Sequence, residues 1–114
     1  MKHNLLRKPK GQRLRVAILD TGVALDQSIF TDEDRDRMKE YACFTGGDAK
    51  KDPNGHGTHI AAIILRLTKN CDLYIAKITE DPMVVQRERV AQVRKRCVPS
   101  LQRSLIVYQG YQIC

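Results

Sequence analysis

Apolar residues in the first two thirds of the chain form short continuous runs separated by polar turns. Residues 14–19 form one such run, which ends at Asp20-Thr21-Gly22, and residues 72–78 form another that contains β-branched and aromatic side chains. Runs of this length that are apolar at most positions are typical of strands buried on both faces of a parallel sheet. We therefore expect two parallel strands, over residues 14–19 and 72–78.

A longer apolar stretch lies between these two strands. Residues 56–67 are apolar apart from the first turn and Arg66, and a helix that is apolar on all sides is a buried one. The pattern therefore predicts a buried helix over residues 56–67. Asn54 is a good cap for its start, and we expect Asn70 to cap its end.

Two shorter elements are predicted between the first strand and this helix. Thr31 and Asp34 have the spacing of a capping box, which predicts that a helix begins there. Residues 41–45 have the composition of a short strand, and Gly46-Gly47 supplies its turn. The order strand, helix, strand, helix, strand predicts an α/β fold, with a parallel sheet flanked by helices.

The character of the chain changes after Pro82. Apolar residues now recur every three or four positions among many arginines, which predicts a basic amphipathic helix that Pro99 stops. Its apolar positions are Met83, Val90, Val93 and Cys97. Residues 105–108 are expected to add a short strand.

The formal net charge of +7 is unevenly distributed. Residues 1–15 carry six basic and no acidic side chains, residues 16–83 carry eight basic and twelve acidic ones, and residues 84–114 carry six basic and one acidic. A mildly acidic body between two basic ends indicates appended segments. We therefore divide the chain into a basic leader (1–13), an α/β part (14–82) and a divergent basic segment (83–114).

Composition argues against several partners and locations. Aromatic residues make up only 5% of the chain, so the stacking platform of a nucleic-acid binder is missing, and we expect no nucleic-acid partner. No apolar run approaches the roughly 20 residues that span a bilayer, and Leu5-Leu6 is too short for a secretory signal. We expect no membrane partner and a cytoplasmic location.

The residues that usually bind metals do not form a recognisable ligand set. The cysteines stand far apart at positions 43, 71, 97 and 114, which predicts reduced and mostly buried thiols. Asp32, Asp34 and Asp36 have the spacing of a calcium loop, but Arg37 occupies the glycine position and Cys43 the closing glutamate position. We expect neither a metal nor another cofactor.

Two residues at the ends of predicted elements carry the candidate chemistry. Asp20 follows a buried strand, and His56 begins the long helix. The carboxyl ends of parallel strands form the usual ligand crevice of an α/β sheet, which would receive both side chains. Either residue alone has an ordinary explanation, as a turn aspartate or as an incidental helix residue. Together, an aspartate followed by a histidine at such positions would supply two of the three members of a Ser-His-Asp triad.

The two motifs resemble those of the subtilisin-like serine proteases, the subtilases. Asp20-Thr21-Gly22 is similar to the aspartate motif of that family, and residues 56–61, His-Gly-Thr-His-Ile-Ala, are similar to its histidine motif. Both occur in the chain order of the family. Ala62 stands where the family usually has glycine. The resemblance extends from about residue 14 to residue 80 and implies part of a three-layer subtilisin-like fold.

The resemblance implies a serine endopeptidase that acts on polypeptides. Asp20 would orient the imidazole, and His56 would be the general base. His59 matches the second histidine of the motif, and we expect it to be buried and hydrogen-bonded. Gly57 would let another backbone or a substrate approach the histidine closely.

The third member of the triad has no candidate in this sequence. The serines are Ser28, Ser100 and Ser104. Ser28 precedes His56, and the other two follow proline and arginine rather than the small residues of the Gly-Thr-Ser motif. The oxyanion asparagine of the family is missing too, because no asparagine follows Asn70.

Three interpretations follow from these patterns. The first is the N-terminal part of a subtilisin-like endopeptidase that is truncated and inactive by itself, with a misread continuation after Glu80. The second is a non-catalytic binding or regulatory remnant of the protease fold, which exposes an unpaired sheet edge. The third is a small basic nucleic-acid binder, whose affinity would have to fall steeply with salt. We favour the first.

Overall fold

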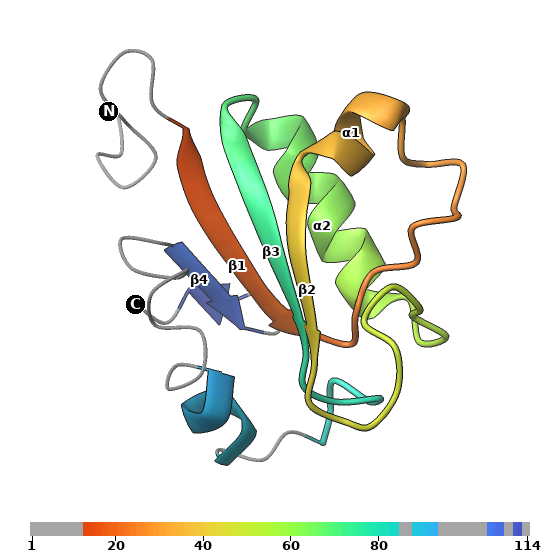
Figure 1. Ribbon diagram of the computed structural model, residues 1–114, viewed down its shortest axis with the longest axis vertical. Coiled ribbons are helices and arrows are strands. Elements are labelled where there is room, and N and C mark those ends of the chain that lie inside the picture. Colours follow the sequence, from red (N-terminus) through yellow and green to blue (C-terminus); the bar gives the residue numbers. More distant parts are fainter. Residues whose placement is uncertain (1–12, 85–87, 94–104, 109–110, 113–114) are drawn as a thin grey trace.

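The computed structural model describes residues 13–84, 88–93, 105–108 and 111–112, and the statements below refer to these residues. They form one sheet with helices packed against it (Figure 1). The strands are β1 (Leu14–Asp20), β2 (Met38–Cys43), β3 (Cys71–Lys77), β4 (Leu105–Tyr108) and β5 (Tyr111–Gln112). The helices are α1 (Asp32–Asp36), α2 (His56–Leu67) and a helical segment at residues 88–93.

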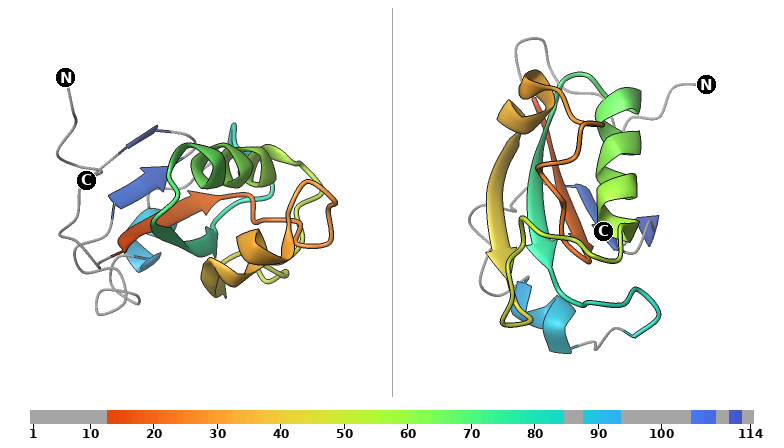
Figure 2. Two further views of the ribbon diagram at one scale, coloured as in Figure 1. Left: turned by 90° about the horizontal axis from the view of Figure 1, so that it is seen from above. Right: turned by 90° about the vertical axis from the view of Figure 1, so that its right-hand side faces the viewer.

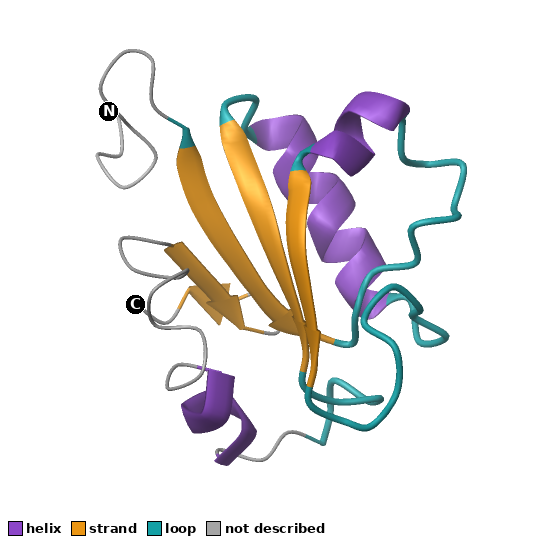
Figure 3. Ribbon diagram, in the orientation of Figure 1, coloured by secondary structure: helices purple, strands orange, loops and turns teal. Residues whose placement is uncertain are grey.

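The strand order in the sheet is β2-β3-β1-β4-β5. The pairs β2–β3, β3–β1 and β1–β4 are parallel, and β5 runs antiparallel to β4. Cys43, Lys77 and Asp20 are register partners across three neighbouring strands. The loops that follow these residues therefore gather at one edge of the sheet, as Figure 3 shows. The predicted α/β fold with a parallel sheet is confirmed.

Each face of the sheet is covered by a hydrophobic cluster. Figure 2 shows α2 lying along one face, where Ala61, Ala62 and Leu65 pack against buried residues of β1 and β3. On the other face Val93 of the helical segment joins a second cluster, and Val90 packs beside it. The remaining members of this second cluster are Ala17, Leu19, Ala76 and Ile78. Because β1 supplies side chains to both clusters, its nearly continuous apolar run is explained.

The prediction that α2 is buried on all sides is wrong. Gly57, Thr58, Ala61, Ala62 and Leu65 are its buried residues, while Ile63 is 39% exposed and Leu67 is 79% exposed. Among the described residues the helix has the sheet on one side only. The bounds of the helix are as predicted.

Both predicted caps of α2 differ in detail. Gly55 is the N-cap and makes no side-chain cap bond, although the side chain of Asn54 does accept the His56 N–H at 3.1 Å. Thr68, not Asn70, is the C-cap. The Asn70 carbonyl instead accepts the N–H of Leu14 at 2.8 Å, which aligns the start of β1 with that of β3.

The strand predicted over residues 41–45 begins three residues earlier, at Met38, and ends at Cys43. Met38 is buried in the first cluster, but the exposed Lys39 and Glu40 interrupt the apolar pattern. This is typical of a strand at the edge of a sheet. The predicted capping box of Thr31 and Asp34 is confirmed, and the helix that it begins is only five residues long.

The predicted basic helix after Pro82 is present only in part. Met83 lies in a turn and is 88% exposed, so it does not belong to the helix. Residues 88–93 are helical, and Val90 and Val93 face the sheet as the spacing predicted. The predictions for Cys97 and for the arginines after Val93 lie outside the described residues.

Candidate functional site

Asp20 ends β1 with its side chain almost completely buried, at 1% exposure. Its Oδ1 accepts the backbone N–H of Thr21 at 2.8 Å, and its carbonyl accepts the N–H of Ile78 at 2.9 Å. The strand breaks here because Gly22 has a φ of +97°, a conformation that favours glycine. A carboxylate held by its own strand and the following turn has little freedom to move.

His56 is the first residue of α2, and its ring reaches Asp20. The Nδ1 atom lies 2.8 Å from both carboxylate oxygens of Asp20. When Nδ1 carries the proton and donates to the carboxylate, Nε2 is left as the proton-accepting nitrogen of the neutral ring. The side chain of His56 is 34% exposed, so the ring is accessible. The structure therefore brings together the two residues that the sequence predicted as a pair.

The close approach of α2 to the end of β1 requires Gly57. A Cβ at this position would lie 2.1 Å from the Gly22 carbonyl oxygen, far inside any real contact distance. Gly57 also donates its N–H to the Thr21 hydroxyl at 2.9 Å. The expectation that Gly57 admits another backbone beside the histidine is confirmed.

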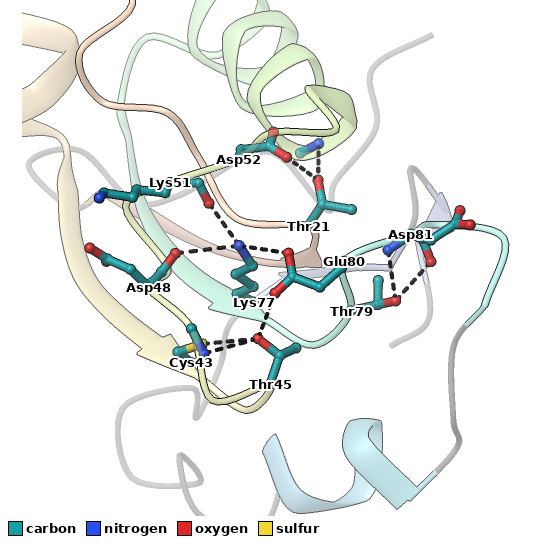
Figure 4. Close-up of polar contacts among 12 residues, drawn as sticks. Thr21, Cys43, Thr45, Asp48, Lys51, Asp52, Lys77, Thr79, Glu80 and Asp81 are labelled. Atoms are coloured by element: carbon teal, nitrogen blue, oxygen red, sulfur yellow. Dashed lines mark hydrogen bonds and ion pairs between the residues drawn. The ribbon is translucent and has the colours of Figure 1, made fainter.

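Asp52 is a buried residue next to this pair that was not predicted from the sequence. It is 8% exposed, and its carboxylate accepts the Thr21 hydroxyl at 2.7 Å and the Gly55 N–H at 2.9 Å. It also accepts the N–H and the hydroxyl of Thr58, at 2.9 and 2.6 Å. An aspartate six residues before a helical threonine is not a capping spacing, so the pattern gave no signal. Figure 4 shows the contact between Thr21 and Asp52.

Lys77 secures the loop that carries Asp52. Its ammonium group is buried at the end of β3, with the side chain 3% exposed, and pairs with the exposed Glu80 at 3.1 Å. It donates to the Lys51 carbonyl at 3.0 Å and approaches the Asp48 carbonyl at 3.5 Å (Figure 4). The ammonium group of Lys77 thus donates the hydrogen bonds that these carbonyls would otherwise accept from water.

The thiol of Cys43 lies at the same edge, 3.3 Å from the Thr45 hydroxyl. Burial alone raises the pKa of Cys43, but hydrogen bonds with Thr45 and Gly47 and the nearby charge of Lys77 outweigh it and lower the pKa overall. Burial raises the pKa of Cys71, and the charge and hydrogen bond of Arg37 offset this only in part. Both are free thiols, as predicted; Cys71 is buried and Cys43 is half-buried.

A family model of the subtilases matches residues 11–88. This range covers more than half of the chain and contains both Asp20 and His56. The chain belongs to the subtilase family. No curated protein matches the chain significantly. Subtilases are serine peptidases, so the chain belongs to a family of hydrolases that act on polypeptides.

Of the other candidate residues for this subtilase site, the structure describes His59 and Ser28. His59 is exposed, so the expectation that it is buried is wrong. Ser28 is exposed in the connection between β1 and α1. Ser100 and Ser104 lie outside the described residues.

No group of three or more histidine, cysteine, aspartate or glutamate side chains could hold a metal ion in the part of the chain that the structure describes. Within the same residues, no helix is long and apolar enough to cross a membrane.

Proposed function

We propose that this chain supplies the aspartate and the histidine of a serine endopeptidase site. The observation that carries the proposal is the 2.8 Å contact of His56 Nδ1 with the buried carboxylate of Asp20. In a triad, a carboxylate in this position fixes the tautomer of the imidazole and stabilises the imidazolium that forms. Nε2 would take the proton of a hydroxyl nucleophile as that hydroxyl attacks a peptide carbonyl.

The same proposal holds that the 114 residues do not hydrolyse peptides by themselves. None of the three serines has the sequence setting of a triad nucleophile, and removing the serine from a subtilisin costs about 10⁶ in turnover. Loss of an oxyanion donor costs a further ~10²–10³. A serine and an oxyanion donor from another part of a longer product, or from another chain, would complete the site.

Labelling with a fluorophosphonate probe, which reacts with activated serines, tests this function. The purified 114-residue chain should not be labelled. The native protein, captured with antibodies against residues 14–82 and weighed intact, should be a longer product that carries a Gly-Thr-Ser motif and is labelled.

Variants of that longer product test the roles of the two residues. Asp20→Asn and His56→Ala should each reduce labelling by about 10⁴ or more. Asp26→Asn and His59→Ala are matched controls, because both residues are exposed, and they should label normally. Undiminished labelling of Asp20→Asn and His56→Ala would overturn the proposal, as would a labelled serine in the 114-residue chain.

A binding role without catalysis is the second candidate. The outer side of α2 exposes Ile63 and Leu67, which form an apolar surface that a further polypeptide could cover. A native product without a nucleophile, monodisperse in sedimentation and melting cooperatively, would favour this role over catalysis. A chain that aggregates when purified alone would count against it.

A further inference from the structure

Asp52 lies between the two elements that carry Asp20 and His56. Its Oδ1 accepts the Thr21 hydroxyl, one residue after Asp20. The same oxygen accepts the N–H of Gly55, one residue before His56. Thr21, the neighbour of Asp20, and Gly55, the neighbour of His56, therefore both bind the same oxygen atom of Asp52.

The second carboxylate oxygen of Asp52 extends the connection into α2. It accepts both the N–H and the hydroxyl of Thr58, and the Thr58 hydroxyl in turn accepts the N–H of Ala24 at 2.9 Å. The chain after β1 is thus joined to the first turn of α2 at a second point. A carboxylate at a helix N-terminus is also favoured by the helix dipole.

The hydroxyl of Thr21 links Asp52 directly to the first turn of α2. Its hydroxyl donates to Asp52 at 2.7 Å and accepts the N–H of Gly57 at 2.9 Å. The first amides of α2 are consequently oriented by side chains from outside the helix, since Gly55 provides no side-chain cap. The contact between His56 and Asp20 tolerates a displacement of well under 1 Å before the hydrogen bond is lost.

We propose that Asp52 is a positioning residue, which with Thr21 holds the His56 imidazole against the carboxylate of Asp20. The inference rests on the proposed function, because it assigns a role in orienting the general base. Only a carboxylate can fill this place: it accepts four hydrogen bonds on two oxygens, whereas an asparagine would point its amide N–H groups at one pair of these donors.

The exchange with water of the His56 ring proton reports on this positioning. In the full chain labelled with nitrogen-15 histidine, Asp52→Asn should speed this exchange by about tenfold or more. The reason is that a displaced His56 ring makes a weaker charge-assisted hydrogen bond with Asp20. Thr21→Val removes the hydroxyl at nearly constant shape and should act similarly. Thr21→Ser restores a hydroxyl and should remain within about twofold of the parent chain.

A control separates positioning from general destabilisation. Val93→Ala truncates a buried side chain of the second cluster, on the sheet face opposite α2, and should leave the exchange of the His56 ring proton within about twofold while lowering stability. If Asp52→Asn does not fold, the comparison of Thr21→Val with Thr21→Ser decides by itself.

The possible results are distinguishable. Exchange in Asp52→Asn or Thr21→Val no faster than in Val93→Ala overturns the positioning role and leaves the proposed function standing. The positioning role is also overturned if the His56 ring proton exchanges as fast in Thr21→Ser as in Thr21→Val. A parent chain in which the His56 ring proton is unprotected contradicts the Asp20 contact itself, and therefore the proposed function as well.

Discussion

Replacing Gly57 by alanine tests how closely α2 must approach the end of β1. A Cβ at position 57 would lie 2.1 Å from the Gly22 carbonyl oxygen and 3.2 Å from two further backbone atoms of Gly22. An ordinary contact needs at least 3.4 Å, so the helix start or the Gly22 turn must move by roughly 1 Å. Gly22 cannot easily yield, because its own φ of +97° is fixed by the turn.

Two effects of opposite sign decide the magnitude for Gly57→Ala. Alanine is favoured over glycine inside a helix by about 1 kcal/mol, while forcing extra atoms into a packed site costs about 1–3 kcal/mol and sometimes more. The struck atoms belong to the backbone, which relaxes poorly, so we expect the clash to outweigh the propensity. With the clash at the upper end of its range, about 2–3 kcal/mol, the net loss in the free energy of unfolding should be about 1–2 kcal/mol.

Urea denaturation and thermal melting of the purified chain measure this loss, and about 1 kcal/mol corresponds to a fall in Tm of roughly 4 °C or more. Gly47→Ala is the matched control, because the nearest atoms to a Cβ there are flexible side chains at 3.4 and 3.6 Å. That control should change stability by less than about 0.5 kcal/mol. A Gly57→Ala variant as stable as the parent would refute the close approach.

Two further predictions concern the loops at the same edge of the sheet. Lys77→Met leaves the carbonyls of Lys51 and Asp48 without the ammonium donor, and it should lower the free energy of unfolding by about 1–3 kcal/mol in urea denaturation. Lys69 is exposed, so Lys69→Met is the control and should change the free energy of unfolding by less than about 0.5 kcal/mol. Because the pKa of Cys43 is lowered and that of Cys71 is raised, Cys43 forms its thiolate at lower pH. Iodoacetamide should therefore alkylate Cys43 faster from neutral pH upward, and equal rates by peptide mass spectrometry would contradict the assigned environments.

Much of the fold could be predicted because its strands are short and apolar. The apolar runs that form β1 and β3 are recognisable in the sequence as buried parallel strands, and the carboxyl ends of parallel strands lie at the same edge of a sheet. β2 was less predictable, because at the sheet edge Lys39 and Glu40 face outward and break the pattern. The exposure of Leu67 on α2 could not be predicted either, because composition does not say how many sides of a helix are covered.

The candidate site was predictable where chemistry is carried by local motifs. Asp20 and His56 each end or begin an element, so their meeting follows from the topology. Asp52 was not predictable, since its partners Thr21 and Thr58 are brought to it only by the packing of α2 on the end of β1. Lys77 gave no signal for the same reason, because a lysine within an apolar strand indicates burial only once its carbonyl partners are known.

The most direct test of the account is the tautomer of the His56 ring, observed by nitrogen-15 spectroscopy on the full chain. The account predicts that in the neutral ring the proton resides on Nδ1, is protected from water by the Asp20 carboxylate, and loses that protection in Asp20→Asn. A proton found mainly on Nε2, or one whose exchange with water is unchanged by Asp20→Asn, would contradict the claim that Asp20 holds His56 as an oriented general base.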